Sequence, residues 1–469
     1  MGASLPRLRK LSDGEAPLLT YLQPRLWGFT MLCGYGLLLA AVIAQEQWLY
    51  AGVLASLPLV VLRPVEMALG VFAFLVPFET IASRNRTAGP GSTLNWYVGA
   101  AAGLLLIGTG LLEARFERPP KAALWWGGLM VWGLSTTLWA VNPDVVLQRL
   151  PTAFALFFLY AAAVCLRVSK TELFWVILLT ILGGLTAATY AAWQFYHGVG
   201  YISADTARKL SSRATLVLSR GETDPNMFAA SLLLPLSLAV GGSLALRRGI
   251  LRIVCWLASA ILTFGLLTTM SRGSLLAVAA MTFVFLRRHR VDWRILTGIA
   301  VLPLMTLALP QVFFARLASG LASHGEGRFD IWRVGLRLLG DWGILGAGLD
   351  NFPVVYSKYA GYAPVFQGFG RAPHNIYLGI AVELGLVGLL LLIGAVSSEM
   401  RAARPFIGSR GTTYSPLETA CEAACWGMLV MGLSIDILWL KAFWLVWILM
   451  ALAVHIRQAD FEAGDGSAR

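Results

Sequence analysis

Long apolar runs recur along nearly the whole chain, and they restrict it to folds that a lipid bilayer can accept. Runs of about 15–25 residues alternate with short breaks that are basic or contain Gly and Pro. Only 13% of the residues are charged, and the mean hydropathy is +0.69. A soluble domain has about 25% charged residues, and a helix of about 20 apolar residues crosses the hydrocarbon core. The sequence therefore predicts an all-α, polytopic integral membrane protein.

Fourteen runs qualify as membrane spans, although two of them are short. The runs at 48–62 and 273–287 could each be a half-helix or a tilted partner. We therefore expect 12–14 transmembrane helices, with 14 as the best count. The expected spans are 26–44, 48–62, 65–80, 95–112, 122–141, 151–167, 171–196, 226–246, 251–270, 273–287, 293–313, 374–396, 418–436 and 440–456.

The basic residues indicate how these spans are oriented. With the N-terminus inside, the inner segments hold 22 of the 37 Lys and Arg residues, and the short outer connections hold only 5. Positive residues concentrate in cytoplasmic loops, so we expect both termini inside and both long polar loops outside. The net charge of +12 then reflects topology and contact with anionic lipid headgroups. Nothing in the sequence indicates a nucleic-acid-binding module.

The two long polar loops divide the chain into three parts. The loops cover 197–225 and 314–373, and both lie in the middle part, 197–396. We expect residues 1–196 to form a scaffold of packed transmembrane helices, and residues 397–469 to form C-terminal transmembrane helices and a tail. Because nearly everything else is apolar, the chemistry of this chain is expected on the side of the two loops.

Four residues on that side are candidates for the chemistry. They are Arg220 before a span, Arg272 between two spans, Arg328 at the start of a helical pattern, and His374 at the start of a span. Arginine offers a planar fork of donors that suits phosphate, and histidine can accept a proton near neutral pH. Converging arginines would form a diphosphate clamp, with His374 as the general base. Taken singly, each arginine could instead anchor a span end or lie on the surface, and His374 could cap its helix.

Within the second loop, a helical pattern runs from about Arg328 to Leu339. Arg328 and Trp332 fall on one face of this helix, so we expect Trp332 to support the site. Glycines precede the helix and leave its N-terminus free to approach an anion closely.

Four further residues are expected to support the site. Asp224 precedes a proline and is predicted to cap the following helix, with Asn226 beside it. Asn375 directly follows His374. Glu383 is the one acid deep in a span, nine residues after His374 and therefore on the opposite side of a helix. We expect Glu383 to make a buried helix–helix hydrogen bond.

Metal sites and disulfides have little support in this sequence. The 5 cysteines lie in or beside apolar spans, and no CxxC, HExxH or DxD motif is present. We expect no metal and no cofactor.

The motifs on the outer side resemble those of the O-antigen ligase and polymerase superfamily over roughly residues 215–395. The strongest are GRFDIW at 327–332, GxG at 346–348, HNxYL at 374–378 and ExGxxG at 383–388. The stretches at 220–226 and 271–273 resemble the preceding motifs of that family. The family often has a proline shortly after the GRxxxW helix, whereas this chain has GDWG at 340–343.

The resemblance implies a fold related to the glycosyltransferase C superfamily, with a large helical periplasmic loop, in the bacterial inner membrane. Members take a glycan from undecaprenyl diphosphate at the periplasmic face without a metal or a nucleotide sugar. Ligases pass the glycan to lipid A-core, polymerases to another lipid-linked repeat, and some relatives to protein. Carried over to this chain, Arg220 and Arg328 would bind the donor diphosphate, His374 would be the base, and Arg272 would be a weaker member.

We therefore expect an O-antigen ligase-like, metal-independent, inverting glycosyltransferase. Its expected partners are the undecaprenyl diphosphate-linked donor, the lipid A-core acceptor and membrane lipids. A polymerase or a protein O-oligosaccharyltransferase of the same family stays open. A lipid-linked glycan transporter is the alternative from another class, and it would need ionisable groups or broken helices near the membrane midplane. Only Glu383 fits that requirement clearly.

Overall fold

The computed structural model describes residues 60–78, 94–199, 213–218, 221–246, 249–289, 327–404 and 415–466. The chain divides into two compact units, Met1–Arg63 and Pro64–Arg469, and the elements below belong to the second unit. The predicted spans 26–44 and 293–313, and most of 48–62, lie outside the described residues. The predicted boundaries of the three functional parts stay a prediction.

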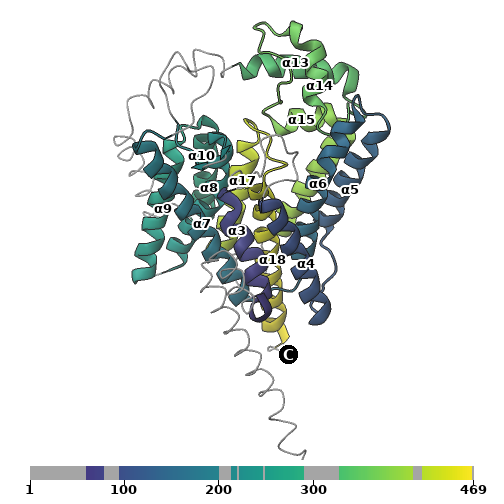
Figure 1. Cartoon of the computed structure of the whole chain (residues 1–469). Coiled ribbons are helices and arrows are strands. Elements are labelled where there is room, and N and C mark those ends of the chain that lie inside the picture. The colour runs from purple at the N-terminus through teal and green to yellow at the C-terminus, as the bar shows by residue number, and fades with distance from the viewer. Residues whose placement is uncertain are drawn as a thin grey trace, which may run out of the picture. The chain divides into compact units, whose positions relative to one another are not determined.

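The described elements are helices, with one small exception (Figure 1). Before the first polar loop they are η1 (Glu66–Gly70), α3 (Val71–Leu75), η2 (Val76–Phe78), α4 (Leu94–Leu112), α5 (Lys121–Ser135), η3 (Thr136–Leu138), α6 (Pro143–Val164) and α7 (Lys170–Tyr196). After it come α8 (Pro225–Ala245), α9 (Ile250–Thr268), α10 (Arg272–His289), α13 (Arg328–Trp342), α14 (Phe352–Tyr359), η5 (Ala360–Tyr362), α15 (Ile376–Glu383), α16 (Gly385–Ala402), α17 (Pro416–Met431) and α18 (Lys441–Gly466).

The exception is a short antiparallel hairpin in the first polar loop, which the sequence analysis did not anticipate. Strand β1 (Val217–Leu218) pairs with β2 (Gly221–Glu222), with Val217 opposite Glu222 and Leu218 opposite Gly221. The Gln194 side chain accepts the backbone N–H of Val217 at 3.1 Å, which joins this hairpin to the end of α7.

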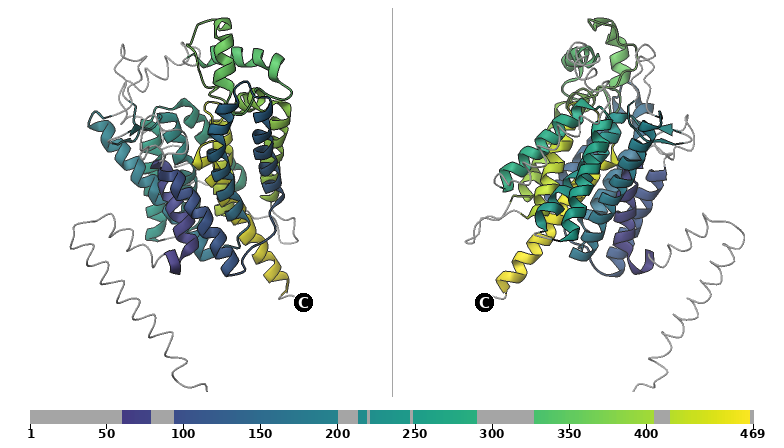
Figure 2. Two further views of the ribbon diagram at one scale, coloured as in Figure 1. Left: turned by 45° about the vertical axis from the view of Figure 1, so that its right-hand side comes forward. Right: turned by 90° about the vertical axis from the view of Figure 1, so that its left-hand side faces the viewer.

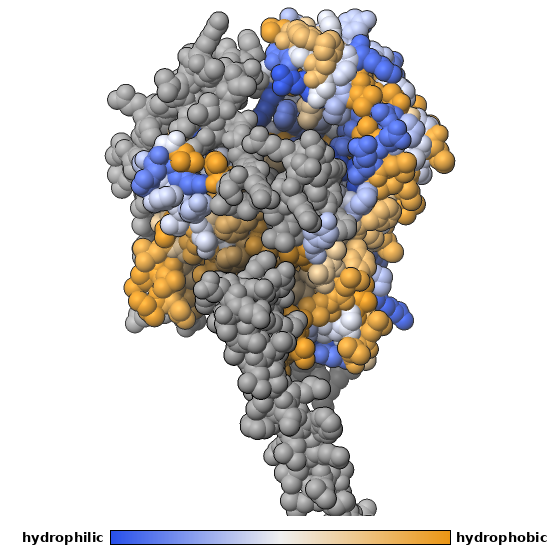
Figure 3. Space-filling view, in the orientation of Figure 1, coloured by the Kyte–Doolittle hydropathy of each residue, from blue (hydrophilic) through white to orange (hydrophobic). Residues whose placement is uncertain are grey.

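Six described helices are long and apolar enough to cross a membrane: α6, α7, α8, α9, α16 and α18. Two shorter apolar helices cover Glu66–Phe78 and Tyr97–Leu112. Apolar side chains dominate the flanks of the helices in Figure 3, and hydrophilic side chains concentrate toward the end that bears α13 and α14. These features agree with an all-helical, multi-pass membrane protein. The count of 14 spans and their orientation stay predictions.

Helices α8 and α18 form the centre of the helical bundle. In the most apolar stretch of 18 residues, 78% of the residues of α8 and 72% of those of α18 are buried. The corresponding share in the other four candidate spans is 28–44%. Helix α17 packs against α8, α10 and α18, while α5 packs against α16 (Figure 2). Such central helices are apolar all round because they face protein on every side.

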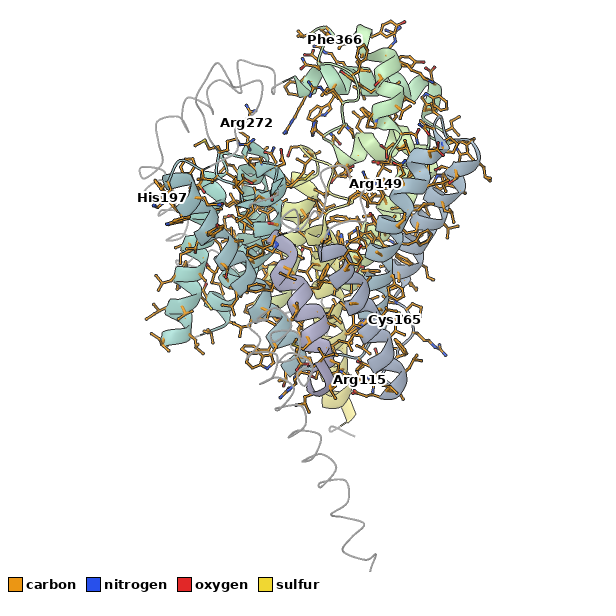
Figure 4. The ribbon with its side chains drawn as sticks, viewed as in Figure 1. Arg115, Arg149, Cys165, His197, Arg272 and Phe366 are labelled. Atoms are coloured by element: carbon orange, nitrogen blue, oxygen red, sulfur yellow. The ribbon has the colours of Figure 1, made fainter. Side chains whose placement is uncertain are left out.

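Ion pairs and hydrogen bonds connect the breaks between helices at one end of the bundle. Arg115 donates to both carboxylate oxygens of Glu172, at 2.9 and 2.6 Å, and to the carbonyl of Arg167. Figure 4 shows Arg115 at the end opposite to Arg272 and Phe366. Residues that the charge pattern assigns to opposite sides of the membrane therefore lie at opposite ends of the bundle.

The described helices of the second polar loop have an apolar core of their own. It joins α13, α14 and α15 through buried residues, among them Val334, Leu338, Phe352, Tyr356 and Val382. The predicted helix at 328–339 is confirmed as α13, and its exposed face carries Arg333 and Arg337. Because α15 leads directly into the bundle, this core fixes α13 and α14 on the end of a membrane span.

The predicted span at 374–396 is wrong in one respect, since it consists of two helices. The chain breaks between α15 and α16 at Leu384–Gly385, where Gly385 has a φ of +65°. The turn at 343–346 occupies the break, and the N–H of Leu386 donates to the carbonyls of Gly343 and Ile344 at 2.9 and 3.1 Å. The indole N–H of Trp132 donates to the Leu384 carbonyl at 2.8 Å. A helix can break near lipid only where such partners satisfy its backbone.

We expect Gly385→Ala to lower the free energy of unfolding by about 1–3 kcal/mol. The φ of +65° disfavours any side chain, and a Cβ would lie 2.1 Å from the carbonyl oxygen of Ile344. Thermal unfolding in detergent micelles measures the effect. Gly108→Ala in α4 is the control, because a Cβ there meets no atom within 4 Å and the helix favours alanine. Equal stability of the two variants would contradict the account of the break.

Candidate active site

His374 precedes α15 in a backbone conformation that is costly for residues other than glycine. Its φ is +48°, and such strain persists only where the surroundings fix it. The indole N–H of Trp332 donates to the Pro373 carbonyl at 3.0 Å. Asn375 Oδ1 accepts two backbone N–H groups of the first turn of α15, at 3.0 and 3.1 Å. The first N–H of α15 donates to the Gly432 carbonyl at 2.9 Å. His374 is thus held from three sides.

Arg328 begins α13, and its surroundings tie it to the segment that leads to His374. Gly327 adopts a φ of +79° and packs closely against Gln367. A Cβ added at Gly327 would lie only 2.2 Å from Gln367 Oε1. The Gln367 side chain donates to Asp330 Oδ2 at 3.0 Å, and the backbone carbonyl of Gln367 accepts from the guanidinium of Arg371. Gln367 therefore joins the first turn of α13 to Arg371, three residues before His374.

Charges from three segments act on the imidazole of His374. Burial lowers the pKa of His374 below its ordinary value, and the guanidinium of Arg328 lowers it further. The carboxylate of Asp224 raises this pKa, and the guanidinium of Arg371 lowers it. Because the net shift is downward, the imidazole is neutral at neutral pH and can accept a proton. The charges of Arg328, Arg371 and Asp224 therefore all act on the imidazole of His374.

Asp224 lies at the end of the first polar loop. As predicted, it caps α8: its Oδ1 accepts the backbone N–H of Asn226 at 2.8 Å and of the next residue at 3.2 Å. Asn226 accepts from the buried Arg213 at 2.9 Å, and Arg213 also donates to the Thr269 carbonyl at 2.9 Å. Arg213 therefore joins the start of α8 to the end of α9.

Arg272 lies close to this region but is not among the charges that shift the pKa of His374 in the described structure. It is the first residue of α10, and a Cβ on Gly273 would lie 2.2 Å from Ser434 Oγ. The same connection, 432–434, accepts the first N–H of α15 through Gly432. The start of α10 and the start of α15 therefore flank one connection. Arg220 lies outside the described residues.

Glu383 is buried, and its hydrogen-bond partners are backbone groups. Its carboxylate accepts the N–H of Asp350 at 2.9 Å and the N–H of Phe352, the first residue of α14, at 3.1 Å. The second bond joins α15 to α14, in agreement with the helix–helix bond that we expected. Asp350 has a φ of +59° and forms an ion pair with Arg149 of α6 at 2.7 Å. Glu383 therefore supports both α14 and the connection that precedes it.

The sequence analysis assigned no role to Arg371 or Arg149. Arg371 could have been found from its position, because a basic residue three places before a candidate base in one polar segment reaches the same surface. Arg149 gives no such signal, since its partner Asp350 is 201 positions away in the chain.

The arrangement offers a neutral, half-buried base and two guanidinium groups whose charges act on it. Such a set suits a reaction in which a hydroxyl loses a proton and a group with developing negative charge departs. In the described parts of the chain, no group of three or more His, Cys, Asp or Glu side chains could hold a metal ion.

Comparison with known proteins agrees with the resemblance seen in the sequence. Residues 257–393 match the model of a protein family described as O-antigen ligase. The matched stretch contains Arg272, Arg328, Arg371, His374 and Glu383. Asp224 and the rest of the first polar loop precede it. No curated protein matches the chain.

We expect Trp332→Phe to loosen the segment around His374 without unfolding the protein. The change keeps a ring but removes the donor to the Pro373 carbonyl, a hydrogen bond worth about 0.5–1.5 kcal/mol. Hydrogen exchange should become faster at the backbone amides of 374 and 375. Trp139→Phe is the control, because the buried indole N–H of Trp139 has no partner in the described structure. Unchanged exchange in Trp332→Phe would contradict the role of this bond.

Proposed function

We propose that this chain is an O-antigen ligase-like glycosyltransferase of the bacterial inner membrane. It moves a glycan from undecaprenyl diphosphate to lipid A-core at the periplasmic face, by a metal-independent and inverting reaction. The family match at 257–393 supports an O-antigen ligase- or polymerase-like function. The observation that carries the finer proposal is the fixed position of His374 beside α13: Trp332 of α13 donates to the Pro373 carbonyl, and the charges of Arg328 and Arg371 act on the imidazole.

In the proposed reaction, His374 takes the proton of an acceptor hydroxyl. The acceptor oxygen attacks the anomeric carbon of the donor sugar, and the bond from that carbon to the diphosphate oxygen breaks. The bonding electron pair leaves with the diphosphate, so the product is the glycosylated acceptor and undecaprenyl diphosphate. The attack inverts the anomeric centre because nucleophile and leaving group lie on opposite faces.

Arg328 and Arg371 hold the donor in this proposal. A guanidinium keeps its charge at any physiological pH and binds phosphate oxygens through two parallel N–H groups. Because Gln367 fixes the position of both segments, the cations are in place before charge develops on the leaving diphosphate. Such preorganised groups stabilise a transition state without reorganisation. Arg220 and Arg272 are proposed as further members of the donor site.

Transport of a lipid-linked glycan is the competing function, and the break between α15 and α16 is the kind of feature it would use. The acid beside that break, Glu383, already binds two backbone N–H groups of the loop. The break is therefore filled by the loop, and this favours transfer over transport.

We expect His374→Ala to lower the rate of glycan transfer by about 10²–10⁴-fold, because general base catalysis contributes that much. Purified enzyme, undecaprenyl diphosphate glycan and lipid A-core are mixed, and the product is identified by mass. Binding of the donor should persist, since the arginines remain. His197→Ala is the control, because His197 lies exposed at the end of α7 and stacks on Trp193. Full transfer by His374→Ala would remove the base from the mechanism.

The pH dependence of kcat/KM should move in opposite directions in two variants. Arg371→Gln removes a cation that lowers the pKa of His374, so this pKa rises and the loss of activity in acid begins at higher pH. Asp224→Asn removes an anion that raises the pKa of His374, so the loss begins at lower pH. Asn still caps α8, which keeps the fold intact. Shifts of the same sign in both variants would contradict the electrostatic arrangement.

A further inference from the structure

A groove of about 740 Å³ lies at the far end of α13 from Arg328. Its volume is within the range of ligand sites, about 300–1,000 Å³. The residues that define it include Trp139, Gly340, Trp342, Ile344, Leu386 and Leu389. They come from the connection after α5, the end of α13, the turn that follows, and the first turns of α16. In Figure 1, α13 lies beyond the ends of α5 and α6.

The walls of the groove are fixed by hydrogen bonds. The N–H of Leu386 donates to the Gly343 carbonyl at 2.9 Å, and the N–H of Gly346 donates to the Trp342 carbonyl at 2.9 Å. These bonds lock the turn after α13 onto the first residues of α16. The groove is therefore preformed, and a ligand would not have to order its walls.

The lining of the groove suits hydrocarbon and not phosphate. Among the described residues that line it, Asp341 is the only charged one, and its carboxylate accepts the hydroxyl of Tyr359. Ile344 is 74% exposed and Leu386 is 53% exposed. One turn further along α16, Leu390 is exposed as well. Because α16 is a candidate membrane span, these exposed leucines extend an apolar surface from the groove along that helix.

The position of the groove separates it from the lipid of the donor. Gly340 lies twelve residues after Arg328, which is about 18 Å along a helix. In a polyprenyl diphosphate donor the hydrocarbon is bonded to the diphosphate itself. Its first isoprene units must therefore lie beside Arg328 and Arg371. A glycolipid acceptor is different, because several sugars separate its acyl chains from the hydroxyl that reacts.

We propose that this groove binds an acyl chain of the glycolipid acceptor. The proposal rests on the proposed function, and it adds a second lipid site at a defined distance from the donor site. Holding one acyl chain there would keep the acceptor glycan over α13, with its reactive hydroxyl directed to His374.

Photocrosslinking tests the occupant directly. The enzyme is reconstituted in vesicles that contain lipid A-core with a diazirine on one acyl chain. We expect labelling of the peptides that contain Trp342 and Leu386, and we expect unlabelled lipid A-core to compete. A diazirine phospholipid and a diazirine undecaprenyl diphosphate serve as comparison probes. Equal labelling by the phospholipid without competition, or preferential labelling by the undecaprenyl probe, would overturn the proposal.

Gly340→Trp tests the consequence for transfer. Gly340 lines the groove, and a Cβ added there would meet no atom within 4 Å, so the position has room for the start of a side chain. We expect KM for lipid A-core to rise at least fivefold and crosslinking to fall, with kcat for a water-soluble core oligosaccharide unchanged. Gly361→Trp is the matched control, because a Cβ at this exposed glycine in η5 also meets no atom within 4 Å.

Failure of the proposed function and failure of the acyl-chain site would give different results. If the unmodified enzyme transfers no glycan to lipid A-core, the proposed function fails, and the crosslinking experiment still decides what binds in the groove. If transfer proceeds and Gly340→Trp has the same KM as Gly361→Trp, the acyl-chain site alone is refuted. His374→Ala should keep the crosslink, because it does not touch the groove.

Discussion

The site depends on the hydrogen bonds that hold the connection at 346–352 against the end of α15. Glu383 accepts the N–H groups of Asp350 and Phe352, and its own carbonyl accepts from Gly348. A carboxylate buried among apolar helices is stable only with such partners. Because the same α15 begins just after His374 and ends at Glu383, one helix of about two turns connects the candidate base to the support of the loop. The loop and the base are therefore positioned by a single rigid element.

This support explains how a strained residue can persist at the site. A φ of +48° at His374 costs energy of the order of 1–3 kcal/mol, and the Trp332, Asn375 and Gly432 contacts around it offset that cost. The charges of Arg328, Arg371 and Asp224 all act on the imidazole of this residue. Two cations against one anion, together with burial, keep the base neutral. A bound diphosphate would bring negative charge and raise the pKa of His374, which would make it a stronger base when the donor is present.

Local patterns in the sequence predicted the local parts of the structure. The helix from Arg328 and the cap at Asp224 follow from residue type and spacing over a few positions, and both are confirmed. The break at Gly385 was missed because its cause, the turn at 343–346, lies some 40 positions earlier in the chain. For the same reason the sequence predicted a helix–helix hydrogen bond for Glu383 but not its partner, Phe352 of α14. An acid in an apolar run signals a buried partner, but its spacing does not tell which distant backbone will supply it. Arg371 was missed because its role depends on Gln367 and α13 rather than on its neighbours.

The length of α13 sets a constraint on how two lipids could be used at once. A reaction between two membrane-anchored substrates needs both hydrocarbon chains in one leaflet and both reacting groups at one point. If the two anchors met at that point, they would compete for the same surface. Helix α13 separates a charged end at Arg328 from an apolar groove at Gly340, so one anchor could lie at each end. The sugars between anchor and hydroxyl would then have to span about 18 Å, the length of that part of the helix. An acceptor with a shorter spacer could not reach His374 from the groove, and the helix would thus select acceptors by length before any sugar is recognised.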